Sequence, residues 1–222
     1  MIKLIIFDWD GTLMDSAYKI TNCIAAAAIE VGIEPPEHDD AKLVIGLGLF
    51  EAMQRLFPDQ SNQTLLALVE AYKQHFVSAD STPQPLFEGV REGLARLEES
   101  GVALAVATGK SRVGLDRVLD ESDLRSVFHT TRCADEARTK PHPQLLLDIF
   151  DFTAIAPRNA IMIGDTTFDM EMAAAAQTRR IGVDYGVHSK SSLKKLGVET
   201  ICATFNEVIE VLMQSEMEPV FQ

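Results

Sequence analysis

The chain has 222 residues, and its 33 Asp and Glu against 20 Lys and Arg give a formal net charge of −13. Hydrophobic residues make up 46% and charged residues 24% of the chain, which is typical of folded globular proteins and excludes a disordered one. Binding to nucleic acid or to an anionic membrane requires basic patches, so the acidic excess excludes a broad surface of either kind. The length fits one or two domains.

The cysteines and the N-terminus point to a reducing compartment. Cys23, Cys133 and Cys202 are widely spaced and form no CxxC pair, which argues against a disulfide framework or a structural zinc site. The first apolar run ends at Asp8 and is too short for a signal peptide or a membrane span. We therefore expect a cytoplasmic protein.

The first predicted element is a buried strand over residues 3–7, which ends in the acidic turn DWDGT. Residues 16–81 then depart from an α/β pattern. Residues 18–31 and 65–77 have helical composition or spacing, and no convincing strand lies between them. This predicts a helical module inserted after the first strand.

From residue 82 onward, β-rich runs alternate with amphipathic helical stretches, which predicts a parallel sheet wrapped by helices. The predicted strands cover residues 102–107, 128–133, 160–163, 180–183 and 200–203. The predicted helices of this part cover residues 90–99, 144–152 and 168–176.

Polar residues follow three of these strands directly. The first strand ends at Asp8 and Asp10, the second at Thr108 and Gly109, and a later one at GDTTFD, which contains Asp165 and Asp169. Because ligands bind at the carboxyl ends of parallel strands, we expect these side chains to gather at one rim of the sheet. A cluster of carboxylates repels itself unless a cation neutralises it.

The spacing of Asp8 and Asp10 puts both side chains on one face if the strand continues. One carboxylate can then act as a nucleophile or metal ligand while the other carries a proton for the leaving group. An ordinary turn, with Gly11 at the bend, would give the same two residues. From these residues alone, both interpretations stay open.

The motifs FDWDGTLMDS, ATGKS, KPHP and GDTTFD, in this order, resemble those of the haloacid dehalogenase superfamily, and within it those of phosphoglycolate phosphatase-like hydrolases. The resemblance covers essentially the whole chain. It implies an α/β fold, with a Rossmann-like parallel-sheet core of residues 1–15 and 82–222 and an inserted α-helical cap domain of residues 16–81.

The resemblance also implies roles. Asp8 would attack phosphorus and form an aspartyl-phosphate, while Asp10 would serve as general acid and base. Mg²⁺ would be held by the carboxylates of Asp8 and Asp165 and the backbone carbonyl of Asp10, with Asp169 in support. The phosphoryl group would be bound by Thr108, Gly109 and Lys140.

Three other features receive an interpretation. We expect Lys110 to be an exposed lysine at a helix start rather than a phosphate ligand. Gly46 and Glu51 match a glycine and an acidic residue common in the caps of the phosphatases that the chain resembles. Trp9 departs from the family's frequent aliphatic residue, and we expect it to affect packing beside the nucleophile.

The resemblance implies a phosphatase for small phosphate monoesters, with phosphoglycolate as a first substrate. Asp10 argues against the dehalogenase and phosphonate-cleaving branches, which lack an aspartate there. A sugar phosphomutase would share the same carboxylates and stays open, as does a signalling protein in which Asp8 is a phosphoacceptor. A small phosphorylated metabolite is the expected partner, and the chain is expected to be a monomer or a homodimer.

Overall fold

The computed structural model describes residues 1–220. Six parallel strands form one sheet in the order β3-β2-β1-β4-β5-β6. Their bounds are β1 Leu4–Phe7, β2 Ala103–Thr108, β3 Thr130–Cys133, β4 Ala160–Gly164, β5 Arg179–Val183 and β6 Ile201–Cys202. The predicted class, an α/β parallel sheet with helices around it, is confirmed, and each predicted strand is present with shifted ends.

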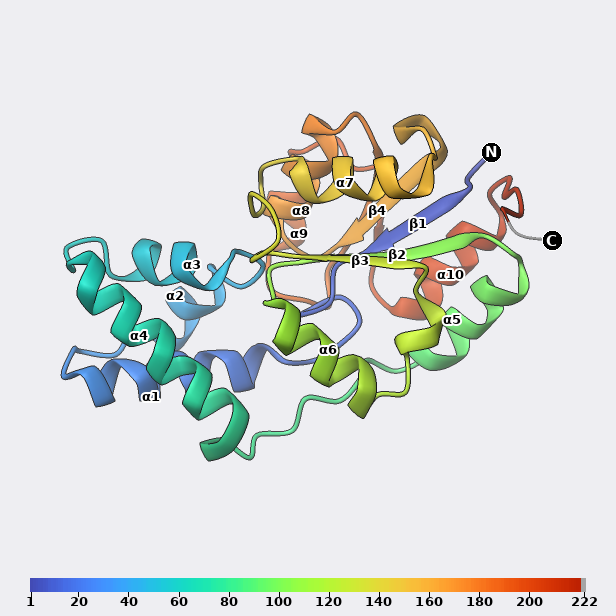
Figure 1. Ribbon diagram of the computed structural model, residues 1–222. Helices are drawn as coiled ribbons and strands as arrows, with labels where there is room; N and C mark the ends of the chain where they lie inside the picture. Colours follow the sequence, from blue (N-terminus) through green and yellow to red (C-terminus); the bar gives the residue numbers. More distant parts are fainter. Residues whose placement is uncertain (221–222) are drawn as a thin grey trace.

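The sheet is buried on both faces, which explains why its central strands are uninterrupted apolar runs. Helices α5 (Val90–Glu99), α6 (Arg112–Glu121) and α10 (Phe205–Met213) cover one face, and α7 (Gln144–Thr153) and α8 (Thr167–Ala175) cover the other. Figure 1 shows these two helical layers on either side of the strands. Side chains alternate between them, so that Ile5 and Phe7 pack on the first layer while Leu4 and Ile6 pack on the second.

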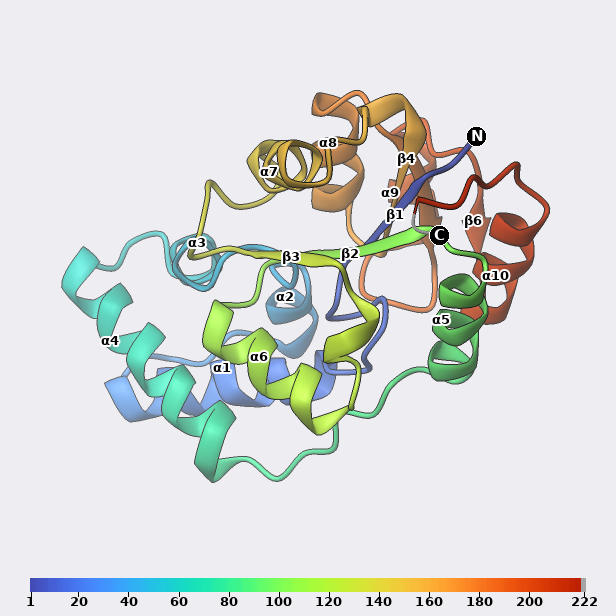
Figure 2. The ribbon, with the colours of Figure 1, turned by 45° about the vertical axis from the view of Figure 1, so that its right-hand side comes forward.

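Helices α1 (Ala17–Val31), α2 (His38–Lys42), α3 (Leu49–Leu56) and α4 (Asn62–Gln74) follow β1 and pack on one another around a separate hydrophobic cluster. A π-helical turn, η1 (His75–Ala79), continues α4. Figures 1 and 2 show this helical module beside the sheet, at the end where β1 and β2 finish. The chain enters the module after β1 and returns to the sheet through residues 80–86.

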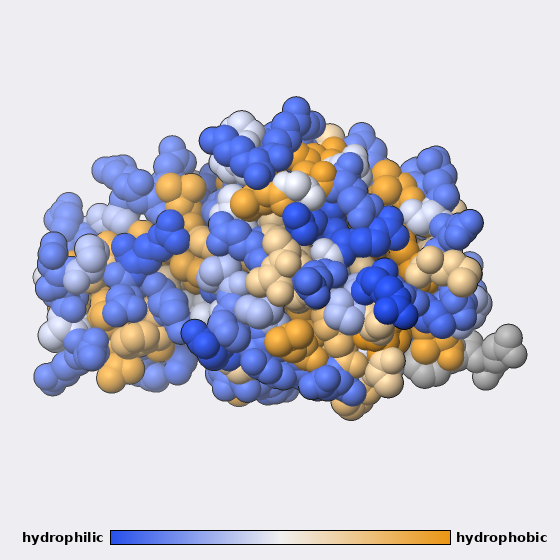
Figure 3. All heavy atoms as spheres, turned by 90° about the horizontal axis from the view of Figure 1, so that it is seen from above, coloured by the Kyte–Doolittle hydropathy of each residue, from blue (hydrophilic) through white to orange (hydrophobic). Residues whose placement is uncertain are grey.

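Several elements escape the sequence prediction. The prediction missed helices α2, α3, α6, α9 (Lys190–Lys194) and α10 and the 3₁₀ turns η2 (Arg125–Val127) and η3 (Pro157–Asn159). Helices α2 and α9 have only five residues each, whereas α6 and α10 bury apolar side chains at a helical spacing that the prediction overlooked. The cysteines are buried and unpaired. Within the described part of the chain, no helix is long and apolar enough to span a membrane. Hydrophilic side chains cover much of the face in Figure 3, with hydrophobic ones scattered among them.

Candidate active site

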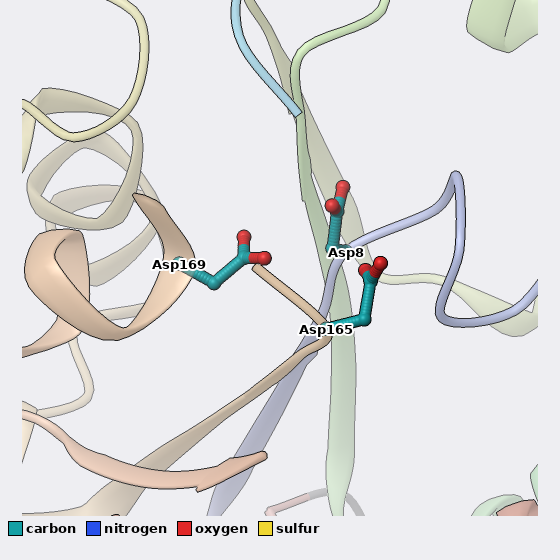
Figure 4. Close-up of side chains that lie close together, drawn as sticks. All are labelled: Asp8, Asp165 and Asp169. Carbon is teal, nitrogen blue, oxygen red and sulfur yellow. The ribbon is translucent and has the colours of Figure 1, made fainter. Parts of the chain in front are cut away.

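The carboxylates of Asp8, Asp165 and Asp169 converge at the C-terminal edge of the sheet, as Figure 4 shows. Asp8 follows β1, Asp165 follows β4, and Asp169 lies in the first turn of α8. One oxygen from each lies within 4.8 Å of the other two, and all three residues are buried. Three buried like charges at this separation require positive charge nearby.

Lys140 supplies part of that charge. Its Nζ lies 2.7 Å from Asp8 Oδ1 and 2.7 Å from Asp169 Oδ1, and its side chain is fully buried. Burial alone would lower the pKa of this lysine, but the two carboxylates outweigh burial and raise its pKa above the ordinary value. One ammonium thus neutralises one of three carboxylates. Lys140 is joined to Pro141 by a cis peptide bond.

One carboxylate oxygen of Asp8 lacks a hydrogen-bond partner among the described residues. The Trp9 backbone N–H and Lys140 both lie against Oδ1, whereas Oδ2 is buried and has no hydrogen-bond partner within residues 1–220. Burial raises the pKa of Asp8 well above its usual range, while Lys140 acts against that rise. An ionised carboxylate with an unused oxygen is available both to bind a cation and to attack an electrophile.

Asp165 is held on both sides. Its Oδ1 accepts from the Thr12 hydroxyl at 2.8 Å and its Oδ2 from the Val187 N–H at 2.9 Å. Burial, reinforced by the charge of Asp169, raises the pKa of Asp165 to about 7. Gly11 and Gly186 leave room for this carboxylate, because a Cβ at either position would collide with it.

Asp169 has both oxygens engaged. Oδ2 accepts from the Thr166 N–H at 3.1 Å and from the Thr166 hydroxyl at 2.7 Å. The Thr166 hydroxyl accepts in turn from the Asp169 N–H, which closes a capping box at the start of α8. Since Oδ1 faces Lys140, Asp169 fixes the lysine and the helix end together.

Asp10 lies outside this cluster and has other partners. Lys110 Nζ lies 2.8 Å from its Oδ1 and 2.9 Å from its Oδ2, and the Ser16 hydroxyl donates to Oδ1 at 2.5 Å. The expectation that Lys110 is exposed is wrong, because its side chain is only 8% exposed. Asp10 lies in the first turn after β1, and Lys110 follows β2. Because β1 and β2 are neighbours, Lys110 lies beside Asp10 and is shielded from solvent. The sequence feature that could have suggested this position is the motif ATGKS, in which the lysine follows the buried strand β2 by two residues.

Thr108 and Gly109 end β2 beside the same carboxylates, and a cavity lined by Asp8, Asp10, Thr108 and Gly109 extends from here. The carbonyls of Gly46 and Leu47, in the loop before α3, lie 2.5 Å from where a Cβ of Gly109 would be. The helical module therefore closes against the sheet at a glycine, where only a missing side chain permits this approach.

The structure brings Asp8, Asp165, Asp169 and Lys140 into one cluster and places Asp10, Thr108 and Gly109 on the adjoining cavity wall. Trp9 is fully buried, with its Nε1 pointing at Met14 Sδ and its ring edge-on to Phe128. It thus packs behind the strand end that carries Asp8. Ser16 is a polar residue of the site that the sequence did not single out.

The chain is similar to known proteins over most of its length. The family model for haloacid dehalogenase-like hydrolase matches residues 5–183. The protein named probable phosphatase IndB of Dickeya dadantii is 34% identical over 94% of this chain and 93% of its own. Phosphoglycolate phosphatase of Agrobacterium fabrum is 28% identical over 82% of this chain and 81% of its own.

The fold is also known. A structure described as a predicted phosphatase from Clostridium acetobutylicum superposes with a TM-score of 0.88 at 24% identity, covering 97% of this chain and 100% of the other. The order of the strands, the cluster of carboxylates at their ends and the family match agree. The predicted family is therefore confirmed, and the chain belongs to the haloacid dehalogenase-like hydrolases.

Proposed function

We propose that this phosphatase hydrolyses small phosphate monoesters with the help of Mg²⁺, through an aspartyl-phosphate formed on Asp8. The observation that carries the proposal is the environment of Asp8. Among residues 1–220, its Oδ2 is buried without a hydrogen-bond partner, beside the ammonium of Lys140 and at the edge of a cavity that also reaches Asp10. The names of the relatives, a probable phosphatase and a phosphoglycolate phosphatase, support it.

The residues present fit a hard divalent cation. Three carboxylates share one ammonium, which leaves negative charge to neutralise, and Asp8 Oδ2 is an unused oxygen ligand. Asp8, Asp165 and the backbone carbonyl of Asp10 would hold Mg²⁺. Asp169 would support them, because Thr166 and Lys140 already occupy its oxygens. The metal would neutralise charge on the phosphoryl oxygens.

The protein residues divide the reaction into two steps. In the first, an oxygen of Asp8 bonds to phosphorus while the ester oxygen leaves with a proton from Asp10. In the second, water attacks the acyl phosphate, gives its proton to Asp10 and releases inorganic phosphate. Lys110 and the Ser16 hydroxyl contact the Asp10 carboxylate and hold it at the cavity wall, where it can exchange a proton with the ester oxygen and with water. Asp10 must take up a proton before the first step.

Three residues would bind the phosphoryl group. Phosphoryl transfer spreads negative charge over the equatorial oxygens, so cationic and N–H donors are needed around them. Lys140 would supply the charge, while Thr108 and the Gly109 N–H would donate hydrogen bonds. Residues 16–81 would act as a cap domain over a core of residues 1–15 and 82–222, because their helices have a hydrophobic cluster of their own.

A turnover assay tests the proposal. The wild type should release phosphate from phosphoglycolate and p-nitrophenyl phosphate over many cycles, with a requirement for Mg²⁺, and Asp8→Asn should abolish release. Asp10→Asn should retain Mg²⁺ binding yet lose at least a hundredfold in kcat, the usual scale of general acid–base catalysis. A stable phospho-Asp8 without turnover, or near-normal Asp10→Asn, would refute the mechanism. Transfer of the phosphoryl group from one position of a glucose phosphate to another, without its release, would identify a mutase instead.

A further inference from the structure

A cavity of about 430 Å³ extends from Asp8 and Asp10 into the helical module. This volume falls within the range of pockets that bind small organic molecules. The phosphoryl group needs only the end near Asp8, Thr108 and Gly109. The rest of the cavity lies beyond the reacting atoms and is the space open to the ester group of a substrate.

The walls of this inner part are largely apolar. They come from α1, the loop between α2 and α3, α3 itself and the turn η1, and most of their apolar side chains are buried, although Val77 on η1 is 66% exposed. The wall residues that matter here are Ile20, Ile24, Val44, Ile45, Ala52 and Phe76. Such a surface gains free energy when it excludes water, and it offers few partners to a hydroxyl or a carboxylate.

Three cations line the cavity, and each lies within 4 Å of a carboxylate, although the Nε of Arg117 is buried without a hydrogen-bond partner within residues 1–220. Lys110 pairs with Asp10 at 2.8 Å, Arg117 lies 3.6 Å from Glu121, and Lys73 lies 3.8 Å from Glu70. A second anionic group on the substrate, such as the carboxylate of phosphoglycolate, would have to compete with these pairs. Lys110 has the close, buried pair, and Arg117 is the wall cation most open to an anionic group, so the inner wall is mainly apolar but not free of charge.

An aromatic pair forms part of the same wall. The rings of Tyr72 and Phe76 stack with their centroids 5.5 Å apart and an interplanar angle of 27°. Both residues line the cavity, on α4 and η1 respectively. Aromatic side chains contribute large apolar areas to binding, so this pair adds to the hydrophobic lining.

We propose that the cavity binds an apolar ester group, so that the preferred substrates are phosphate monoesters of alcohols with a chain or ring of about six carbons or more. This inference rests on the proposed function and specifies its substrate class. Esters of short polar alcohols, glycolate among them, would react more slowly because they leave the apolar wall uncovered.

A series of n-alkyl phosphates from ethyl to hexyl, together with 2-phenylethyl phosphate, tests the proposal. These leaving groups have similar chemical reactivity, so differences in kcat/KM report on binding of the chain. Each buried methylene can contribute up to about fourfold. We expect hexyl and 2-phenylethyl phosphate to exceed ethyl phosphate and phosphoglycolate at least tenfold, equivalent to 1.4 kcal/mol. Equal values along the series would overturn the inference and leave the proposed function standing.

Filling the cavity with a larger side chain should remove the preference for hexyl over ethyl phosphate. Ala52 on α3 lines the cavity and is 5% exposed, so Ala52→Phe places a ring inside it. The hexyl-to-ethyl ratio should fall to below threefold. Leu66→Phe adds a ring to α4 at a position that is 59% exposed, and its ratio should equal that of the wild type. If folded Ala52→Phe kept the hexyl-to-ethyl ratio of the wild type, the alkyl group of the substrate would bind elsewhere, and the inference would be overturned.

A binding measurement tests the cavity assignment independently of the proposed phosphatase activity. Titration calorimetry with Mg²⁺ present should show hexylphosphonate binding to the wild type at least tenfold more tightly than ethylphosphonate. If the protein bound hexylphosphonate in this way but hydrolysed no phosphate ester, the cavity assignment would stand and the proposed function would fall. Equal affinities for the two phosphonates would count against the cavity assignment itself.

Discussion

At the scale of single residues, the site is an unbalanced set of buried charges. Asp8, Asp165 and Asp169 face one another around the single ammonium of Lys140. Burial raises the pKa of both Asp8 and Asp165, which means that holding them ionised together costs free energy. A divalent cation would remove that cost, so binding of the cation should stabilise the folded state.

Mg²⁺ should therefore raise the melting temperature of the wild type. At a hundredfold excess over Kd, linkage gives about 2.7 kcal/mol, or about 5–10 °C for a chain of this size. Asp165→Asn should abolish the shift. Asp184→Asn, at a carboxylate paired with Lys190 instead, should retain it. Differential scanning calorimetry in Mg²⁺ and in chelator measures both, and an equal shift in Asp165→Asn would contradict the assignment of Asp165.

Lys110 offers a second test at this scale. It contacts both oxygens of Asp10, and hydrogen bonds between charged groups contribute about 1.5–3 kcal/mol. Lys110→Met should therefore reduce kcat/KM about tenfold or more through loss of the orientation of Asp10. Lys194→Met, on the exposed side of α9, is the matched control and should leave kcat/KM unchanged. Wild-type kinetics in Lys110→Met would show that Ser16 alone suffices to hold Asp10.

At the scale of elements, the strands are predictable and the connections less so. The runs Leu4–Phe7 and Ala160–Gly164 are buried on both faces, so they read as apolar strands from sequence alone. The short helix α2 and the loop at Gly46 and Leu47 carry no such pattern. Contacts made only in the folded chain fix them, including the approach of the Gly46 carbonyl to Gly109.

The candidate site, like the fold, was predictable from the sequence only in part. Motif resemblance gave candidates that follow strand ends, because the parallel sheet brings strand ends together. It did not give the pairing of Lys110 with Asp10, nor the hydrogen bond from Ser16. Those contacts depend on the register of β1 against β2, in which Phe7 faces Val106, and a single sequence does not specify that register.

The capping box of α8 links the start of this helix to the charged residues of the candidate active site. Thr166 caps the helix and also holds Asp169, which pairs with Lys140. Thr166→Ala should destabilise the protein by about 1 kcal/mol, as expected for a lost N-cap, and should also lower kcat at least threefold. Chemical denaturation and phosphate-release assays measure the two effects.

A matched control exists in α10. Thr204 caps that helix by accepting from the Glu207 N–H at 3.2 Å, and neither residue lines the active-site cavity. Thr204→Ala should lose similar stability and keep the wild-type kcat. If both variants kept full activity, the capping box of α8 would have only a structural role.

At the scale of the whole molecule, the net charge of −13 opposes the approach of a phosphate ester. Lys110 and Lys140 attract it only at close range, since both pair with acids and are nearly buried. The long-range repulsion is screened by salt, because the Debye length falls from about 30 Å at 0.01 M to about 8 Å at 0.15 M. Salt should therefore help the substrate bind.

Raising KCl from 0.01 to 0.15 M should increase kcat/KM for a dianionic ester about twofold, while kcat stays constant. Mg²⁺ must be kept saturating, because salt also weakens the attraction of the acidic cluster for the metal. Steady-state kinetics in KCl and in choline chloride should agree, which separates screening from binding of K⁺. A fall in kcat/KM with salt would mean that the local cations outweigh the acidic surface, and that the substrate is drawn to the site from a distance.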